Sequence, residues 1–249
     1  MENLKRHAEE NLRRLAENPY PGRGIVLGRS HGGRLLQFYW VMGRSESSRN
    51  RVLVREGREV RTQALDPAKV EDPSLVIYTC MREARGQHLV SNGDHTDTLA
   101  EAVAAGKSLH DALASISHEP DPPHLTPRIA GGISPVQTAA GAGSPLAWLA
   151  IVKADRFDGA RSDRFFFQYA DLPPGYGWCL TTYRGDGQPL PSFEGTPYLL
   201  PLNGPEDDLL PWLWHRLNEK NRVAIVLKII EPDSSTDIRI VNKYGGNGA

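Results

Sequence analysis

The sequence predicts an α+β fold in which two antiparallel sheets pack together and helices cover them from outside. Three observations lead to this class. Apolar, β-prone stretches occur in pairs around turn residues. In the middle of the chain the apolar residues recur once at helical spacing instead, and the chain ends in a further predicted hairpin. Strands that follow one another in hairpins favour antiparallel sheets over a doubly wound parallel sheet. No repeat or linker divides the 249 residues, so we expect one domain, 1–249.

The first third of the chain supplies one helix and three hairpins. Residues 2–18 form an amphipathic helix with Leu4, Leu12 and Leu15 on one side, and this extension (1–20) ends in the prolines and glycines of NPYPGRG. Hairpins are predicted for 24–28 with 34–43, for 51–57 with 59–65, and for 74–83 with 86–93.

In the rest of the chain, predicted helices, loops and strands follow one another less regularly. Helical spacing from Thr96 to Ser117 breaks at Gly106, and the proline-rich residues 119–127 form a loop. Helix 206–220 contains Pro211, which either kinks it or marks its first turn. Strands are predicted in RIAGGIS and LAWLAIVKAD around the turn AAGAGSP, in RFFFQYADL and GWCLTTYRG, and in the closing hairpin RVAIVLKIIE with TDIRIVNKY; the tail 245–249 is expected to fray.

Composition excludes several classes of protein. Hydrophobic residues make up 39% and charged residues 24%, as in a soluble globular protein, and a net charge of −1 gives no electrostatic footprint for nucleic acid or an anionic membrane. Cys80 and Cys179 form no CxxC pair. Residues 1–18 are charged throughout, unlike a secretory signal, and no run approaches the ~20 apolar residues of a membrane span. A cytoplasmic location is therefore expected.

Two polar clusters lie beside the early strands. GRSESSRNR (43–51) contains Arg44, Asn50 and Arg51, and arginine binds phosphate or carboxylate bidentately. The alternative is a solvated loop; a Walker loop is excluded because its glycines and Lys-Ser/Thr are missing. Tyr78 lies in an apolar strand and needs a hydrogen-bond partner if buried, while Cys80 is interpreted as a small buried residue with no base nearby.

Two more clusters flank the predicted helices. In VSNGDHTDT, Asp94, Thr96 or Asp97 suits an N-cap, but capping explains only one of them. No metal-ligand spacing accompanies His95, so we expect no metal. In HEPDPPHLTPR (118–128), prolines stiffen the loop that carries Glu119, which helps to hold a catalytic carboxylate still. The alternative is an ordinary rigid connection.

Taken in order, these motifs resemble the archaeal-type IMP cyclohydrolase family. GRGIVLGR, GRSESSRNR, IYTCMR, VSNGDHTDTLAEAVAAG and LTPRIAGGI carry the resemblance, which covers roughly residues 22–190. The resemblance implies a four-layer α-β-β-α fold similar to the N-terminal-nucleophile hydrolases. It also implies an enzyme of purine biosynthesis that closes the ring of 5-formamidoimidazole-4-carboxamide ribotide (FAICAR) to give IMP and water, by acid–base catalysis without a metal or another cofactor.

The resemblance also assigns roles. It implies catalytic roles for Tyr78, Glu119 and Arg51, with Tyr78 as proton donor and Glu119 as base for the attacking amide. The match of Glu119 requires a one-residue insertion among the prolines. The residues implied in binding the nucleotide are Arg44, Asn50, Asn92, Asp94, His95, Thr96 and Arg128.

The chain departs from the family pattern at both ends. The N-terminal helix and the proline- and tryptophan-rich segment 190–215 are additions, and Arg184 replaces an acidic residue after TY. We expect them either to alter the substrate or only to add cover and a contact in a homo-oligomer. Two alternatives stay open: a purine-nucleotide-binding protein that has lost catalysis, and an amide hydrolase, which requires a nucleophile freed at an N-terminus.

Overall fold

Two antiparallel sheets form the body of the protein in the computed structural model, which describes residues 2–70, 73, 76–135 and 146–245. The first sheet contains β1 (Gly24–Arg29), β2 (Leu35–Met42), β10 (Tyr176–Thr181), β11 (Tyr198–Pro201), β12 (Arg222–Ile230) and β13 (Thr236–Asn242). The second contains β3 (Val52–Glu56), β4 (Glu59–Gln63), β5 (Thr79–Ala84), β6 (Gln87–Ser91), β7 (Arg128–Ile133), β8 (Ala147–Ala154) and β9 (Ser162–Tyr169). The helices are α1 (Glu2–Glu17), α2 (Glu46–Arg49), α3 (His95–Ala104), α4 (Leu109–Ala114) and α5 (Glu206–Trp214), with a 3₁₀ turn at Pro67–Lys69.

The strand order confirms the predicted hairpins. The first sheet runs β11-β10-β1-β2-β12-β13 and the second β3-β4-β5-β6-β7-β8-β9. All pairs of neighbouring strands are antiparallel, including β1 with β2, β3 with β4, β5 with β6, and β12 with β13. The second sheet therefore follows chain order, whereas the first joins the two ends of the chain.

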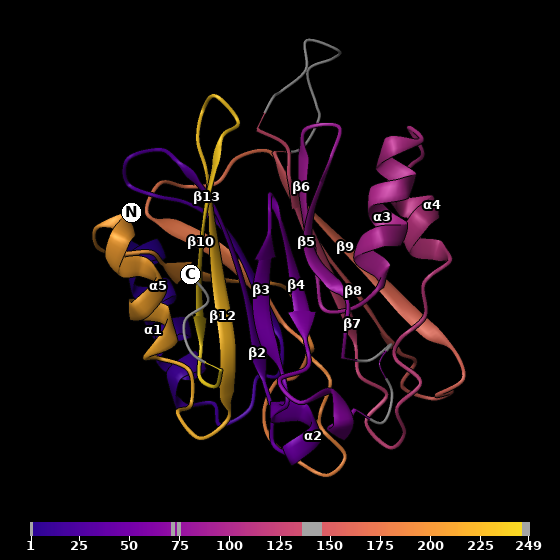
Figure 1. Cartoon of the computed structure of the whole chain (residues 1–249). Coiled ribbons are helices and arrows are strands. Elements are labelled where there is room, and N and C mark those ends of the chain that lie inside the picture. The colour runs from indigo at the N-terminus through magenta and orange to yellow at the C-terminus, as the bar shows by residue number, and fades with distance from the viewer. Residues whose placement is uncertain (1, 71–72, 74–75, 136–145, 246–249) are drawn as a thin grey trace.

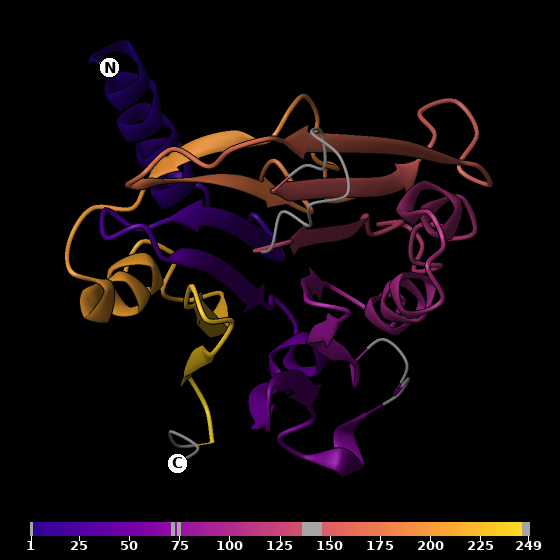
Figure 2. The same ribbon diagram turned by 90° about the horizontal axis from the view of Figure 1, so that it is seen from above.

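Helices cover the outer face of each sheet, and the molecule has four layers (Figure 1). Helices α1 and α5 pack on the first sheet, and α3 and α4 on the second, on opposite sides of the sandwich (Figure 2). One apolar core fills the space between the sheets, and a further core lies beneath each helical layer. The α-β-β-α sandwich of antiparallel sheets is thus confirmed.

Strand β2 illustrates why the central strands read as continuous apolar runs. Successive side chains of a strand point to opposite faces. Phe38 and Trp40 accordingly enter the core beneath α1 and α5, while Tyr39 and Val41 enter the core between the sheets. Because both faces of β2 are covered, no polar alternation is needed.

The structure corrects the sequence-based boundaries in the C-terminal third. The helix predicted for 206–220 ends at Trp214, because β12 begins at Arg222 and the amides of Asn221 and Arg222 bond to the Asn218 carbonyl. Pro211 lies inside α5. Strand β11 was missed in the proline-rich segment; it is an edge strand with Pro201 at its end, a position where proline's missing donor is tolerated.

Other predictions need smaller adjustments. The break between α3 and α4 falls at Gly106, which has a φ of +69° as a helix-ending glycine does. Strand β5 begins at Thr79, later than the predicted 74. The turn AAGAGSP lies wholly outside the described residues, as does most of the tail 245–249.

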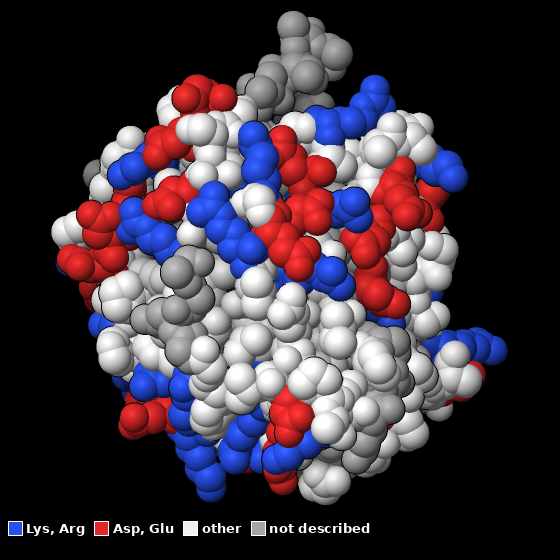
Figure 3. All heavy atoms as spheres, in the orientation of Figure 1, with Lys and Arg blue, Asp and Glu red and all other residues white. Residues whose placement is uncertain are grey.

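The described surface carries charges of both signs. On the face seen in Figure 1, Lys and Arg side chains intermingle with Asp and Glu (Figure 3), and no large area of that face has a single sign. In the described part of the chain, none of the helices has the length and apolar character needed to cross a membrane.

A candidate active site at one end of the sandwich

The ends of several strands bring a group of buried polar side chains together at one end of the sandwich. Arg23 precedes β1, Arg51 precedes β3, Tyr78 precedes β5 and Asn92 follows β6. Because neighbouring strands are antiparallel, these starts and ends lie at the same end of the two sheets, where α2 lies in Figure 1. We call this group the buried cluster; its members are Arg23, Tyr39, Arg51, Tyr78, Asn92, Glu119, Thr126 and Tyr183, all less than a tenth exposed.

Two glycines allow Arg23 to occupy its position. Gly22 has a φ of +75°, and a Cβ there would lie 2.1 Å from Oγ1 of Thr182. A Cβ on Gly24 would lie 1.9 Å from the ring of Trp40. The Arg23 backbone is fixed by two hydrogen bonds with Thr182: its amide donates to Oγ1 at 3.1 Å, and its carbonyl accepts from the Thr182 amide at 2.9 Å.

Arg23 and Arg51 place two guanidinium groups in the interior. Nε of Arg23 and both Nε and Nη1 of Arg51 are buried without a hydrogen-bond partner among the described residues. Burial, and next the charge of Arg23, lower the pKa of Arg51. Burial alone would lower the pKa of Arg23. The nearby carboxylate of Glu119 is the largest of several contributions that act in the opposite direction, and together they raise the pKa of Arg23. Unpaired buried donors of this kind are costly unless a ligand satisfies them.

A pair of tyrosines joins the two sheets. The hydroxyl oxygen of Tyr39, from β2, lies 2.7 Å from that of Tyr78, next to β5. Burial raises the pKa of both phenols, so both carry their protons at neutral pH. The Tyr78 backbone is held by Thr62, whose Oγ1 accepts from the Tyr78 amide at 3.0 Å.

Glu119 is a buried carboxyl group with an unusual pKa. Burial raises its pKa to about 7, an effect that Arg23 opposes and the nearby Asp121 reinforces. Nδ2 of Asn92 donates to Oε1 of Glu119 at 3.3 Å, and the Glu119 amide donates to the Thr126 carbonyl at 2.9 Å. Glu119 can therefore accept or release a proton close to neutral pH.

A hydrogen-bonded chain supports the loop that carries Glu119. The Thr126 amide donates to Oδ1 of Asp121 at 2.6 Å, and Oγ1 of Thr126 lies 2.6 Å from the hydroxyl of Tyr183. Asn92 also fixes this loop, because its Nδ2 donates to the Pro127 carbonyl at 3.0 Å and its Oδ1 accepts from the Ile129 amide at 2.6 Å. The stiff connection expected from the prolines thus has hydrogen bonds that hold it.

The VSNGDHTDT stretch builds one wall beside the cluster. His95 is buried, its Nε2 lies 3.2 Å from the Ile129 carbonyl and its Nδ1 lies 3.1 Å from Nη1 of Arg128. Burial, and next the charge of Arg128, lower the pKa of His95 to about 3. The ring is therefore neutral, with Nε2 as donor and Nδ1 as acceptor.

Asp94 and Thr96 have local roles in the same stretch. Asp94 occupies the N-cap position of α3 but caps it with no side-chain hydrogen bond; instead its exposed carboxylate pairs with Arg128. Oγ1 of Thr96 donates to the Gly93 carbonyl at 3.1 Å and also bonds to Ser91. Arg128 thereby links Asp94 to His95 at the edge of the buried cluster.

Two residues of the GRSESSRNR motif lie apart from Arg51. Arg44 pairs with Asp186, donates to the Gly187 carbonyl at 3.0 Å and lies over the Tyr20 ring. Asn50 is buried, but both ends of its amide are taken by the backbone of Asp66, at 2.8 and 2.7 Å. In this structure Asn50 shapes the loop, and a nucleotide would have to displace those bonds to reach its side chain.

Sequence reasoning missed Arg23, Tyr39 and Tyr183. Arg23 stands between two glycines at the start of a strand. This pattern indicates a backbone that packs closely against its neighbours. Tyr39 looked like one more core residue of an apolar strand, and only its contact with Tyr78 distinguishes it. Cys80, in contrast, was interpreted correctly as a buried residue, because it is fully buried and burial raises the pKa of its thiol.

Comparison with known proteins identifies the family of this chain. The family model of the IMP cyclohydrolase-like proteins matches residues 20–234. A protein of Methanothrix thermoacetophila named IMP cyclohydrolase is 29% identical over 180 residues, which are 71% of this chain and 80% of that protein.

Two further relatives carry the same name over shorter matches. A Halobacterium salinarum protein is 34% identical over 55% of this chain, and a Methanopyrus kandleri protein is 34% identical over 44%. These matches span 64% and 56% of the two relatives, which is less than two thirds of the length of each. The matched family region begins after α1 and includes the whole buried cluster, and the chain belongs to the IMP cyclohydrolase-like protein family.

Proposed function

We propose that this chain is an IMP cyclohydrolase, an enzyme that closes the ring of FAICAR to give IMP and water. Membership of the family and the name of the relatives support this reaction. The observation that carries the proposal is the buried cluster, in which a carboxyl group with a pKa of about 7, a protonated tyrosine pair and two buried guanidinium groups occur together.

The reaction needs proton transfers at two stages and a fixed geometry. The carboxamide nitrogen attacks the formyl carbon and loses one of its two protons, a C–N bond forms, and the formyl oxygen takes up a proton to give a cyclic carbinolamine. The hydroxyl group then leaves as water after a second protonation, and the former formamide nitrogen loses its proton as the C=N bond forms to it. Ring closure is intramolecular, so a site that fixes the reactive rotamer removes much of the barrier.

Tyr78 suits the role of proton donor to the formyl oxygen. Its raised pKa keeps the phenol protonated at neutral pH. Tyr39 lies 2.7 Å away and is placed to return a proton to Tyr78 after the transfer. A positioned acid of this kind typically contributes about 10²- to 10⁴-fold in rate.

Glu119 suits the role of base for the attacking carboxamide nitrogen. With a pKa of about 7, a large fraction of Glu119 is ionised at neutral pH, yet the group also returns its proton readily. The same carboxyl group, once protonated, is suited to protonate the leaving hydroxyl. Asn92 orients the carboxyl group through its 3.3 Å hydrogen bond.

Arg23 and Arg51 suit the binding of negative charge. Three of their buried guanidinium nitrogens have no hydrogen-bond partner among the described residues. A phosphate group or the developing oxyanion would satisfy these donors, and charge-assisted bonds to arginine are among the stronger ones in proteins. We assign Arg51 to the substrate as the sequence suggested, and we add Arg23.

The remaining predicted residues act around this centre in our proposal. Arg128 and His95 form a wall that Asp94 and Thr96 hold in place, and Arg44 lies farther out with Asp186. We assign Asn50 to the loop rather than to the nucleotide. A cytoplasmic location and assembly into a homo-oligomer stay predictions from the sequence.

One assay tests the proposal directly. Purified protein, treated with a chelator, is mixed with FAICAR, and IMP is followed by chromatography. We expect IMP to form well above the rate without protein, and equally fast with and without the chelator. Nucleotide binding without IMP formation would instead favour the catalytically inactive binding protein, and loss of activity on chelation would contradict a metal-free mechanism.

A further inference from the structure

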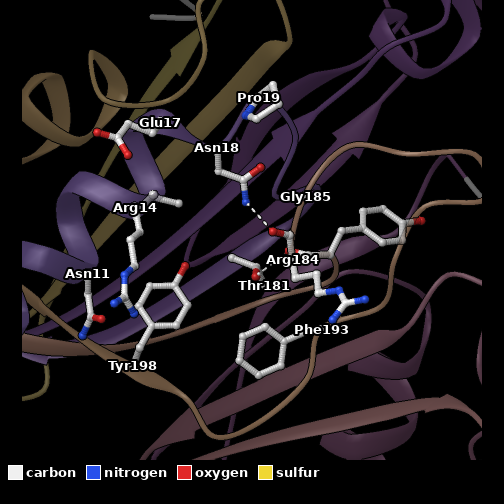
Figure 4. A pocket seen from close by; sticks show the side chains of 12 residues that line it. Asn11, Arg14, Glu17, Asn18, Pro19, Thr181, Arg184, Gly185, Phe193 and Tyr198 are labelled. Carbon is white, nitrogen blue, oxygen red and sulfur yellow. Dashed lines mark hydrogen bonds between the residues drawn. The ribbon is translucent and has the colours of Figure 1, made fainter.

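A cavity of about 420 Å³ lies beside the buried cluster and has α1 as one wall. Figure 4 shows Asn11 and Arg14 of the N-terminal helix beside Tyr198, with Phe193 and Arg184 of the later chain across from them. The lining residues that matter for a ligand are Arg14, Glu17, Tyr183, Arg184, Phe193 and Tyr198. Of the buried cluster, only Tyr183 lines this cavity among the described residues.

The cavity depends on a part of the chain outside the matched family region. The family model begins at residue 20, whereas Asn11, Arg14 and Asn18 precede it. Arg184 lies within the matched region and faces Arg14 across the cavity. The N-terminal segment and the matched region therefore build this cavity together.

The walls combine aromatic rings with positive charge. Phe193 is buried, at 6% exposed, and Tyr198 is half-buried; their ring centroids lie 6.3 Å apart, and the parts of the two rings that reach the cavity form an apolar wall for a planar ligand. The lining contains two guanidinium groups, Arg14 and Arg184, and one carboxylate, Glu17, so its charged side chains favour an anion.

Both guanidinium groups are available to a ligand. The side chains of Arg14 and Arg184 are 66% and 59% exposed, and among the described residues their ion pairs are with the exposed carboxylates Glu10 and Glu194. Exposed pairs of this kind contribute little stability, so a phosphate can replace the carboxylates at small cost.

We propose that this cavity binds a nucleoside monophosphate, with the base against Phe193 and Tyr198 and the phosphate between Arg14 and Arg184. The volume falls within the ~300–1,000 Å³ of small-molecule sites. An aromatic anion without a sugar would leave part of it empty, and inorganic phosphate alone would leave the aromatic wall uncovered.

The bound ligand acts as an effector of the neighbouring buried cluster. The Tyr183 ring lines the cavity, and its hydroxyl lies 2.6 Å from Oγ1 of Thr126, whose carbonyl accepts from the Glu119 amide. A ligand that shifts Tyr183 or the Arg184 backbone changes the support of Glu119. This effect on turnover rests on the proposed function, whereas binding in the cavity does not.

Calorimetry on the full-length chain tests the binding. Adenosine monophosphate is titrated into the wild type, where we expect two sites, one in the buried cluster and one in the cavity. The double variant Arg14→Ala/Arg184→Ala should weaken one site at least about tenfold, because charge-assisted bonds are lost, and leave the other unchanged. Adenosine or inorganic phosphate alone should bind the cavity more weakly than adenosine monophosphate.

Matched variants make the test specific. Arg6→Ala/Arg161→Ala removes the same number of exposed arginines, one of them from α1, and neither residue lines the cavity. It should keep both sites. A single site in the wild type that is lost in Arg51→Met, or equal isotherms for wild type and the cavity variant, would overturn the proposal. Cavity binding by a protein that forms no IMP would refute the proposed function alone.

Discussion

The hydroxyl groups of Tyr39 and Tyr78 share a hydrogen bond of 2.7 Å, and each residue comes from a different sheet. The bond crosses the interface between the sheets at the end where Arg23, Arg51 and Glu119 are buried. Packing of the two sheets therefore assembles the proposed proton donor together with its partner, and neither sheet alone forms the site.

Replacement of Tyr78 by Phe should lower kcat by about 10²-fold or more, because it removes the proposed acid, and should change KM little. Steady-state kinetics of IMP formation gives both values. Tyr39→Phe should cause a smaller loss, since Tyr78 keeps its proton but loses its partner. Tyr176→Phe, on β10 at the opposite end of the sheets, is the control. An unchanged kcat in Tyr78→Phe would exclude this residue from the mechanism.

Replacement of Arg51 by Met should separate binding from stability. Burial and the charge of Arg23 lower the pKa of Arg51, so its positive charge is disfavoured in the free protein. A methionine of similar length removes this unfavourable charge, and we expect an equal or higher Tm.

The same variant should weaken nucleotide binding at least about tenfold, because charge-assisted bonds to the ligand are lost. Calorimetry and thermal unfolding measure the two effects on one sample. Arg55→Met changes an exposed arginine and should alter neither. A lower Tm with unaltered affinity would assign Arg51 a structural role and place the anion elsewhere.

Glu119 should give the protein a characteristic dependence on pH. Its pKa is about 7 in the folded state against 4.5 ordinarily, so between these values the folded state binds more protons than the unfolded state. The contribution of Glu119 to the free energy of unfolding should therefore fall as pH rises from 4.5 to 7. Glu119→Gln should remove that contribution, so that its Tm exceeds that of the wild type most clearly above pH 7.

Activity should change in the opposite direction over the same range. If Glu119 is the base, kcat/KM should rise with pH toward 7 and then level, and Glu119→Gln should be almost inactive at every pH. Thermal unfolding and initial rates at several pH values test both statements. Glu56→Gln, an exposed carboxylate, serves as the control. A pH profile of activity that persists in Glu119→Gln would show that another group titrates.

Local sequence patterns predicted most of the fold, because the turns between neighbouring strands contain recognisable residues. Hairpins such as β1–β2 and β3–β4 depend on glycines and polar residues next to the strands, which a sequence displays. The pairing of β2 with β12 and of β1 with β10 joins residues far apart in the chain, and no local pattern specifies it.

The same distinction between local patterns and contacts far apart in the chain applies to the residues of the candidate site. Tyr78 and Glu119 belong to recognisable motifs and were predicted, while Arg23 and Tyr39 enter the site only because the first sheet packs on the second. Asn50 shows a different limit of local patterns. A polar residue beside an arginine suggested a ligand contact, but its amide bonds to the backbone of Asp66.

Replacement of Gly22 by Ala should displace Arg23 and thereby reduce both stability and activity. A Cβ at Gly22 would lie 2.1 Å from Oγ1 of Thr182 and 2.5 Å from the Tyr183 ring, and the φ of +75° is unfavourable for alanine. The backbone term alone costs roughly 1–2 kcal/mol. Gly57→Ala isolates that term, because Gly57 has a φ of +64° with nothing within 4 Å of the added Cβ. Denaturant unfolding should therefore show a modest loss in Gly57→Ala and a larger one in Gly22→Ala, and only Gly22→Ala should lose nucleotide affinity. Equal losses of stability with intact affinity in both would show that the packing around Gly22 does not position Arg23.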